Sequence, residues 1–179
     1  MTDTDTHAQR IHHDWHAAVV ARDLDALMAL YAPDAILETP LIVVTLPEHG
    51  SGVLHGKTAI AAFFAAGLRD PRSRLGRWYR TGQFFSNGRQ LIWEYPRATP
   101  DGDQVDLVEV MDLRDGLIAH HRVYWGWAGF NALRCAARRR RTGARDARRP
   151  GCAHATYIAT LTNWHRLPAS TNRCQMPCP

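Results

Sequence analysis

The first 134 residues contain no cysteine, because all four cysteines of the chain lie further on, at Cys135, Cys152, Cys174 and Cys178. A disulfide framework for that part is therefore excluded. No run approaches the roughly 18 consecutive apolar residues that a membrane span needs, and residues 1–10 lack the basic-then-apolar order of a secretory signal. We expect a soluble, cytoplasmic protein with no membrane partner.

Phosphate-binding loops, nucleophile elbows and dinucleotide fingerprints are also missing. The sequence Gly50-Ser51-Gly52 lacks the preceding strand and the opening helix that such motifs need. His12 and His16 lie one helical turn apart, but no third ligand accompanies them, so we expect a solvated helix face and not a metal site. With no cofactor and no metal expected, proton transfer on an apolar molecule, or plain binding, remains.

Positive charge is concentrated at the end of the chain. Residues 1–134 carry 13 Lys and Arg against 16 Asp and Glu, whereas residues 135–179 carry 9 against 1. Arginine tracts can neutralise phosphates, but no stacking aromatics interleave with Arg138–Arg141, so nucleic acid is not an expected partner. We predict a domain over 1–134 and a disordered tail over 135–179, whose abrupt change of composition also fits a shifted reading frame.

Helical periodicity dominates the first part of this domain and alternation the second. Apolar spacing predicts helices over about 8–22, 24–31 and 57–68, with a short strand at 35–41 and a loop at 47–56. After Pro71, turn signals separate four alternating runs, at about 76–85, 90–98, 104–113 and 117–126. Together these elements predict an α+β fold in which a strongly curved, mostly antiparallel sheet wraps three N-terminal helices.

Four motifs in this order carry a family resemblance: Ala21–Leu27, Leu30–Ala35, Gly56–Ile60 and Leu113–Ile118. Over about residues 8–133 the chain resembles the nuclear-transport-factor-2-like superfamily, most closely its SnoaL-like and ketosteroid-isomerase-like branches. The resemblance implies a cone-shaped α+β barrel with a deep apolar pocket, often dimeric through the outer sheet face. That superfamily includes isomerases, cyclases, dehydratases, epoxide hydrolases and non-catalytic binders, so the fold alone does not define the function.

The residues of the isomerase transfer only in part. The resemblance places Trp15 where the isomerase has its tyrosine oxyanion donor, and Glu109 where it has a protonated aspartate. Thr39 falls at the position of the aspartate base. Because a threonine cannot take a proton from carbon at neutral pH, this position argues against the isomerase mechanism.

The turn at Arg114-Asp115-Gly116 decides which side chains of the last two strands meet. A bulge at Gly116 sets Glu109 opposite His121, whereas a plain two-residue turn sets Glu109 opposite Arg122. We favour the first register, because it keeps His121 on the apolar face and Arg122 on the other. Similar reasoning at Pro100–Gly102 sets Trp93 beside Glu109 and Tyr95 beside Leu107.

These arguments converge on a candidate site. We predict Glu109 and His121 as an acid/base pair; the alternative is a satisfied polar pair that lines a cavity. Trp15 or Tyr95 would donate to developing oxygen charge, and the expected substrate-binding residues are Trp15, Thr39, Trp93, Tyr95, Met111, Val123 and Trp125.

Two functions remain open at this point. One is a SnoaL-like enzyme that isomerises, cyclises, hydrates or dehydrates a hydrophobic small molecule. The other is a non-catalytic hydrophobic-ligand-binding or dimerisation module of the same fold. Val108 and Val110 lie on the face opposite Glu109, where a monomer should be polar, so we also expect a homodimer.

Overall fold

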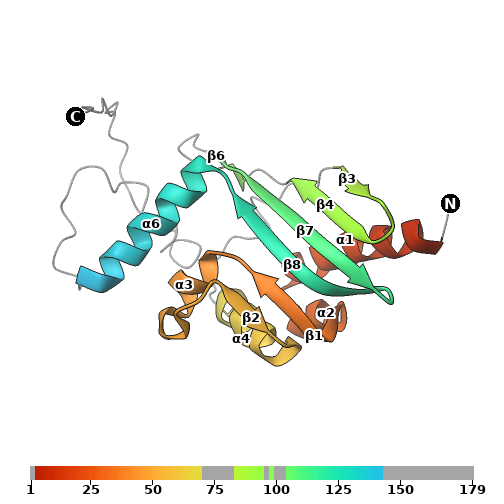
Figure 1. Ribbon diagram of the computed structural model, residues 1–179, viewed down its shortest axis with the longest axis horizontal. Helices are drawn as coiled ribbons and strands as arrows, with labels where there is room; N and C mark the ends of the chain where they lie inside the picture. Colours follow the sequence, from red (N-terminus) through yellow and green to blue (C-terminus); the bar gives the residue numbers. More distant parts are fainter. Residues whose placement is uncertain (1–2, 70–82, 95–96, 99–103, 143–179) are drawn as a thin grey trace.

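The computed structural model describes residues 3–69, 83–94, 97–98 and 104–142 (Figure 1). Its elements in chain order are α1 (Asp3–Ala21), α2 (Leu24–Ala29), β1 (Tyr31–Glu38), α3 (Leu41–Thr45), the 3₁₀ helix η1 (Pro47–His49), β2 (Val53–His55), α4 (Lys57–Leu68), β3 (Phe84–Ser86), β4 (Gln90–Glu94), β5 (Arg97–Ala98), β6 (Gln104–Val105), β7 (Leu107–Arg114), β8 (Leu117–Trp125) and α6 (Trp127–Thr142).

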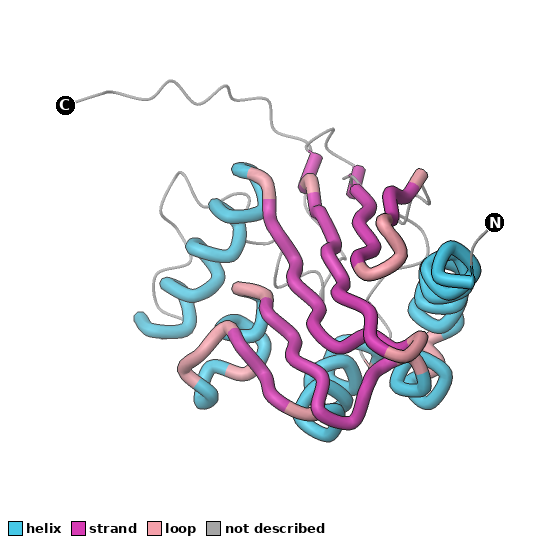
Figure 2. Tube along the Cα trace, turned by 45° about the vertical axis from the view of Figure 1, so that its right-hand side comes forward, coloured by secondary structure: helices cyan, strands magenta, loops and turns pink. Residues whose placement is uncertain are grey.

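Six of the strands form one mixed sheet in the order β2-β1-β8-β7-β4-β3. The β1–β8 pair is parallel and the other pairs of this sheet are antiparallel, while β5 and β6 form a separate two-stranded ladder. Helices α1, α2 and α4 lie behind the sheet in Figure 1, and Figure 2 shows the curvature of the strands. The expected α+β fold with a curved sheet is confirmed.

The core lies between these helices and one face of the sheet, called here the inner face. Helix α1 contributes Ile11, Trp15 and Val19, all buried, at the helical spacing expected from the sequence. Asp23 caps α2, because its carboxylate accepts a hydrogen bond from the backbone N–H of Ala26 at 2.9 Å. From the sheet, Leu91, Met111 and Ile118 complete the core.

Three details of the first half differ from the sequence predictions. The helix expected to reach Tyr31 ends at Ala29, and Tyr31 instead begins β1, where it pairs with Ile118 of β8. This strand ends at Glu38, before the expected limit at residue 41. The segment expected to be a loop contains η1 and β2, and β2 pairs with β1. Helix α4 has the expected bounds.

The second half is more finely divided than expected. The run predicted at 76–85 lies mostly outside the described residues, which resume with β3. The run at 90–98 forms β4 and β5, and the run at 104–113 forms β6 and β7. Helix α6 crosses the expected boundary at residue 135 and continues to Thr142, so the division of the chain at that point stays a prediction.

The register of β7 and β8 corrects both alternatives derived from the sequence. Asp115 and Gly116 have φ of 54° and 73°, so they form a tight two-residue turn with Arg114 opposite Leu117. A bulge then places one extra residue, Ala119, in β8, and beyond it Met111 lies opposite His121 and Glu109 opposite Val123. This extra residue shifts the rest of β8 by one position, so the same side chains face inward as with the expected bulge at Gly116. Glu109 and His121 therefore share the inner face as diagonal neighbours, not as direct partners.

None of the helices in the described parts of the chain is both long and apolar enough to cross a membrane.

Candidate active site

Glu109 and His121 meet on the inner face, between strands β7 and β8. Their side chains are only 2% and 1% exposed. His121 Nε2 forms a short hydrogen bond with Glu109 Oε2. In a medium of low dielectric constant, such a contact is stronger than in water, and leaving either partner unpaired is correspondingly costly.

The pair continues into a buried chain of hydrogen bonds. The Tyr31 hydroxyl lies 2.8 Å from His121 Nδ1 and 3.3 Å from Trp15 Nε1. An indole N–H can only donate, so the Tyr31 oxygen accepts from Trp15 and its own O–H is directed to His121 Nδ1. The remaining proton of a neutral His121 imidazole is then on Nε2, which donates to Glu109. This assignment makes Glu109 the final acceptor of a chain that starts at Trp15.

Burial keeps the tyrosine of this chain in its phenol form. The pKa of Tyr31 is raised far above its usual value, first by complete burial and further by the negative charge of Glu109, while the hydrogen bond from Trp15 opposes the rise. Tyr31 must keep its proton to donate the hydrogen bond to His121 Nδ1. Tyr31 is the one member of the chain that the sequence did not identify, because its predicted position was the end of a helix.

Of the other expected site residues, those that the structure describes on strands β4, β7 and β8 lie on the same face. Trp93 is fully buried directly opposite Glu109, as predicted. Met111, also fully buried, lies opposite His121. Val123 and Trp125 are partly buried at the continuation of β8. Tyr95 lies outside the described residues.

Thr39, at the position of the isomerase base, is 3% exposed. Its hydroxyl oxygen accepts a hydrogen bond from Trp125 Nε1 at 3.1 Å. A hydroxyl engaged in this way positions the Trp125 ring. It provides no basic group for carbon chemistry.

Two histidines of α1 belong to the surroundings of Glu109, contrary to the expectation of a solvated helix face. His16 is 5% exposed, and its ring centroid lies 5.5 Å from that of Trp93. The ring of His12 lies 5.2 Å from that of Trp93, edge to face. The two residues flank the stripe of Ile11 and Trp15, so a wider reading of the apolar face would have included them.

Burial keeps both imidazoles neutral. The pKa of His12 falls to about 4, chiefly by burial and then by repulsion from His16 and His13. Burial also lowers the pKa of His16, although its hydrogen bond to the His12 carbonyl and the negative charge of Glu109 act in the opposite direction. Within the described ranges, no cluster of three or more His, Cys, Asp or Glu side chains forms a possible metal site.

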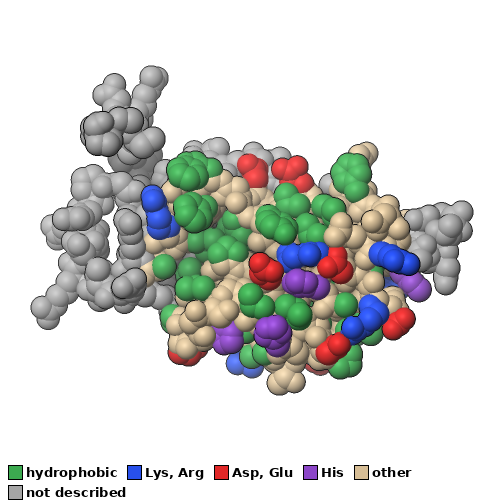
Figure 3. All heavy atoms as spheres, in the orientation of Figure 1, with side chains coloured by type: hydrophobic (Ala, Val, Ile, Leu, Met, Phe, Trp, Pro, Cys, Tyr) green, Lys and Arg blue, Asp and Glu red, His purple; other side chains and the backbone are tan. Residues whose placement is uncertain are grey.

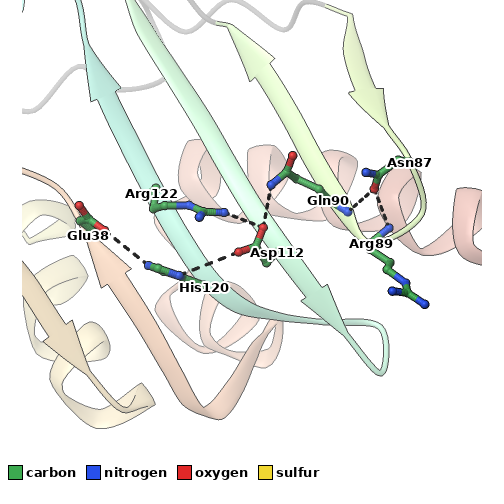
Figure 4. A network of polar contacts seen from close by, with 7 residues as sticks. All are labelled: Glu38, Asn87, Arg89, Gln90, Asp112, His120 and Arg122. Carbon is green, nitrogen blue, oxygen red and sulfur yellow. Dashed lines mark hydrogen bonds and ion pairs between the residues drawn. The ribbon is translucent and has the colours of Figure 1, made fainter.

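The opposite side of the same strands, the outer face, carries a separate polar network (Figure 4). Asp112 accepts hydrogen bonds from Arg122 at 2.6 Å and from Gln90 at 2.9 Å. His120 bridges to Asp112 at 3.9 Å and to Glu38 at 3.6 Å. Arg122 therefore lies on the face opposite His121, as expected.

A mixed curved sheet that covers N-terminal helices is the fold of the nuclear-transport-factor-2-like proteins that this chain resembles. Residues 12–121, more than half of the chain, match the family model of the SnoaL-like domain. The chain thus belongs to the SnoaL-like family.

Solved structures agree at the level of the fold. A SnoaL-like protein of unknown function from Burkholderia thailandensis has 22% identity and a TM-score of 0.55, over 70% of this chain and 98% of that one. An NTF2-like protein of unknown function from Mesorhizobium loti has 21% identity and a TM-score of 0.54, over 70% and 96%. TerC, co-crystallised with polyporic acid, has 16% identity and a TM-score of 0.52, over 71% and 97%. A comparison with curated proteins finds no match.

Proposed function

We propose that this domain catalyses cofactor-free proton transfer on a hydrophobic small molecule that carries a carbonyl group. The observation that carries the proposal is the buried chain from Trp15 through Tyr31 and His121 to Glu109. It holds the carboxylate in one orientation with donors that need no rearrangement, which is the condition for efficient acid/base catalysis.

In the proposed reaction, Glu109 takes a proton from the carbon next to the carbonyl. The C–H electron pair moves into a new C–C double bond, and the carbonyl π electrons move to the oxygen. Glu109 then returns the proton to another carbon of the same molecule, or gives it to a hydroxyl group on the adjacent carbon, which leaves as water. Isomerisation, cyclisation and dehydration share this first step, and hydration is the reverse of the dehydration. His121 positions the carboxylate in each case.

The surroundings of the pair favour an uncharged, largely apolar substrate. Trp15 and Trp93 lie edge to face at 5.5 Å, and Trp15 lies 5.9 Å from the His121 ring. TerC was co-crystallised with polyporic acid. As part of the proposal we extend to the present chain only the preference for a small organic molecule, not for an acid group.

A second candidate function is binding without catalysis. It is favoured by the almost complete burial of Glu109 and His121, since a satisfied buried pair can be purely structural. The two functions differ in one measurable property, the exchange of hydrogens on a bound carbonyl compound.

The test is deuterium incorporation next to the carbonyl of 2-tetralone in D₂O, followed by NMR. The wild-type chain should accelerate the exchange, and Glu109→Gln should lower the acceleration by about 10²–10⁴-fold, because the amide keeps the shape but not the basicity. Glu48→Gln, at an exposed position of η1, is the matched control and should leave the rate unchanged. Binding of 2-tetralone without accelerated exchange would favour the binding module.

A further inference from the structure

The indole N–H of Trp93 is a buried donor without an acceptor in the described parts of the chain. The side chain is 0% exposed, and Nε1 makes no hydrogen bond there. The other two indoles of the inner face differ in this respect, since Trp15 donates to Tyr31 and Trp125 donates to Thr39. Because an indole N–H can only donate, and an unmade buried hydrogen bond is costly, an acceptor is expected at Trp93.

The position of Trp93 connects this donor to the proposed chemistry. In the β4–β7 pair, Trp93 lies directly opposite Glu109. Side chains in such cross-strand pairs have Cβ atoms about 4.5–5.5 Å apart. The side chains of Trp93 and Glu109 are therefore neighbours on the inner face.

The helix above Trp93 supplies a second polar group without a described partner. His12 Nε2 is buried and makes no hydrogen bond among the described residues, and the His12 ring stands edge-on to the Trp93 ring at 5.2 Å. His16 Nδ1 donates to the His12 carbonyl at 2.7 Å, which leaves Nε2 of the neutral His16 ring as its acceptor atom. The rings of His12, His16 and Trp93 thus lie close together between α1 and β4.

We infer that Trp93 Nε1, together with the imidazole of His12, forms an oxygen-binding subsite for an uncharged carbonyl compound beside Glu109. This inference deepens the proposed function and assigns to Trp93 the donor role that the sequence had suggested for Trp15 or Tyr95. Trp15 is already committed to Tyr31.

The charges around the subsite exclude an anionic ligand group. His12 and His16 are neutral at pH 7 because burial lowers their pKa values. The nearest charge in the assigned network is the negative charge of Glu109, which would repel a carboxylate or phosphate. A ketone oxygen accepts from Trp93 without that repulsion.

The test compares the affinities of a ketone and its hydrocarbon for the full-length protein. 2-Tetralone and tetralin are the probes, with 1,2,3,4-tetrahydro-2-naphthoic acid as the anionic analogue, and calorimetry gives their dissociation constants. The wild-type protein should bind the ketone at least tenfold more tightly than the other two. Trp93→Phe should lower the affinity for the ketone about tenfold, or about 1.4 kcal/mol, and change that for tetralin less than twofold. Trp127→Phe, at a position 72% exposed, should change neither.

NMR of the wild-type protein provides a measurement that does not depend on the folding of the variant. The indole N–H signal of Trp93, assigned in the wild-type protein by triple-resonance and NOE experiments, should move downfield when 2-tetralone binds. The inference is overturned if this signal does not move, if ketone and hydrocarbon bind equally, or if Trp93→Phe weakens both alike. Ketone binding through Trp93 without deuterium exchange would instead contradict the proposed function alone.

Discussion

The two faces of the β7–β8 pair carry two polar networks that differ in burial. On the inner face, Glu109 and His121 are 2% and 1% exposed. On the outer face, Asp112 and Arg122 are 39% and 23% exposed, although the contact between them is also a close one. Strand alternation produces both networks from one stretch of sequence. Burial, more than the distance between the charged groups, therefore decides how much each network contributes to stability and to chemistry.

The outer face also differs in its apolar content. Figure 3 shows charged and histidine side chains near the middle of this face with hydrophobic side chains around them. Val108 and Val110 are partly exposed there, and Tyr124 is 56% exposed. Apolar strand residues on an exposed sheet face fit the homodimer expected from the sequence, in which a second copy would cover them.

The largest effect is expected from His121→Phe. The substitution leaves the buried carboxylate of Glu109 without its imidazole partner, which should lower the free energy of unfolding by about 3–5 kcal/mol. Urea denaturation measures the loss. His120→Phe, on the outer face, is the matched control and should cost less than about 1 kcal/mol.

A double variant separates pairing from packing. Glu109→Leu combined with His121→Phe replaces both partners by apolar groups and should recover part of the stability that His121→Phe loses. If His121→Phe alone unfolds like the wild type, the inner pair contributes little and the contrast between the two faces is wrong.

Tyr31→Phe should have the next largest effect. The hydroxyl accepts from Trp15 and donates to His121, so its removal should cost about 1–3 kcal/mol in the free energy of unfolding. The 2-tetralone exchange rate should fall as well, because His121 loses the donor that fixes its tautomer. Unchanged stability and exchange would show that the chain of hydrogen bonds ends at His121.

Val110→Lys tests the proposed dimer through the outer face. A charge at this position should weaken association at least tenfold, about 1.4 kcal/mol, and sedimentation at micromolar concentration should detect a shift to monomer. Val20→Lys, on the exposed side of α1, should leave the dimer intact. A wild-type protein that sediments as a monomer would contradict the proposal.

The pH dependence of stability tests whether His12 of α1 is buried against the inner face. The pKa of His12 is lowered from 6.5 to about 4 in the folded chain. The unfolded chain therefore binds the proton first, and stability should fall as the pH drops from about 6.5 toward 4. His12→Phe keeps an aromatic ring among its neighbours and should lose less stability between pH 7 and 4.5 than the wild type. Val20→Gln should keep the wild-type pH dependence.

The faces could be predicted from the sequence, but the register could not. The alternation of apolar and polar residues in each strand places Glu109 and His121 on the apolar face of the sheet and Arg122 on the other face. The Arg-Asp-Gly turn is compatible with either a bulge or a two-residue turn, and the bulge at Ala119 has no signal in the turn residues. A bulge at Gly116 and a bulge at Ala119 each insert one residue. The predicted face of Glu109 and His121 was therefore right, while their predicted direct pairing was wrong.

Tertiary contacts determine the parts of the site that the sequence did not show. Tyr31 continues a helical pattern, but it becomes a strand residue because the parallel pairing with Ile118 of β8 overrides the local preference. His16 looks like a polar surface residue on an isolated helix. It flanks the apolar stripe of α1 and is buried because Trp93 approaches from the sheet, and the stripe alone does not show how far that contact extends.

The smallest effect is expected from Asp112→Asn, which removes the charge that Arg122 pairs with on the outer face. In a partly exposed pair, water replaces most of the lost interaction, so the free energy of unfolding of dilute protein should change by less than about 1 kcal/mol. If the outer face is covered in a dimer, the same pair is removed from water and its loss becomes more costly. The destabilisation by Asp112→Asn should then grow with protein concentration, whereas that by Glu109→Gln should stay constant, because the inner pair is buried within one chain. Denaturation of both variants at two concentrations, well below and well above the dimer dissociation constant, measures this difference. Equal concentration dependence for the two variants would remove the distinction between an outer face used for association and an inner face used for chemistry.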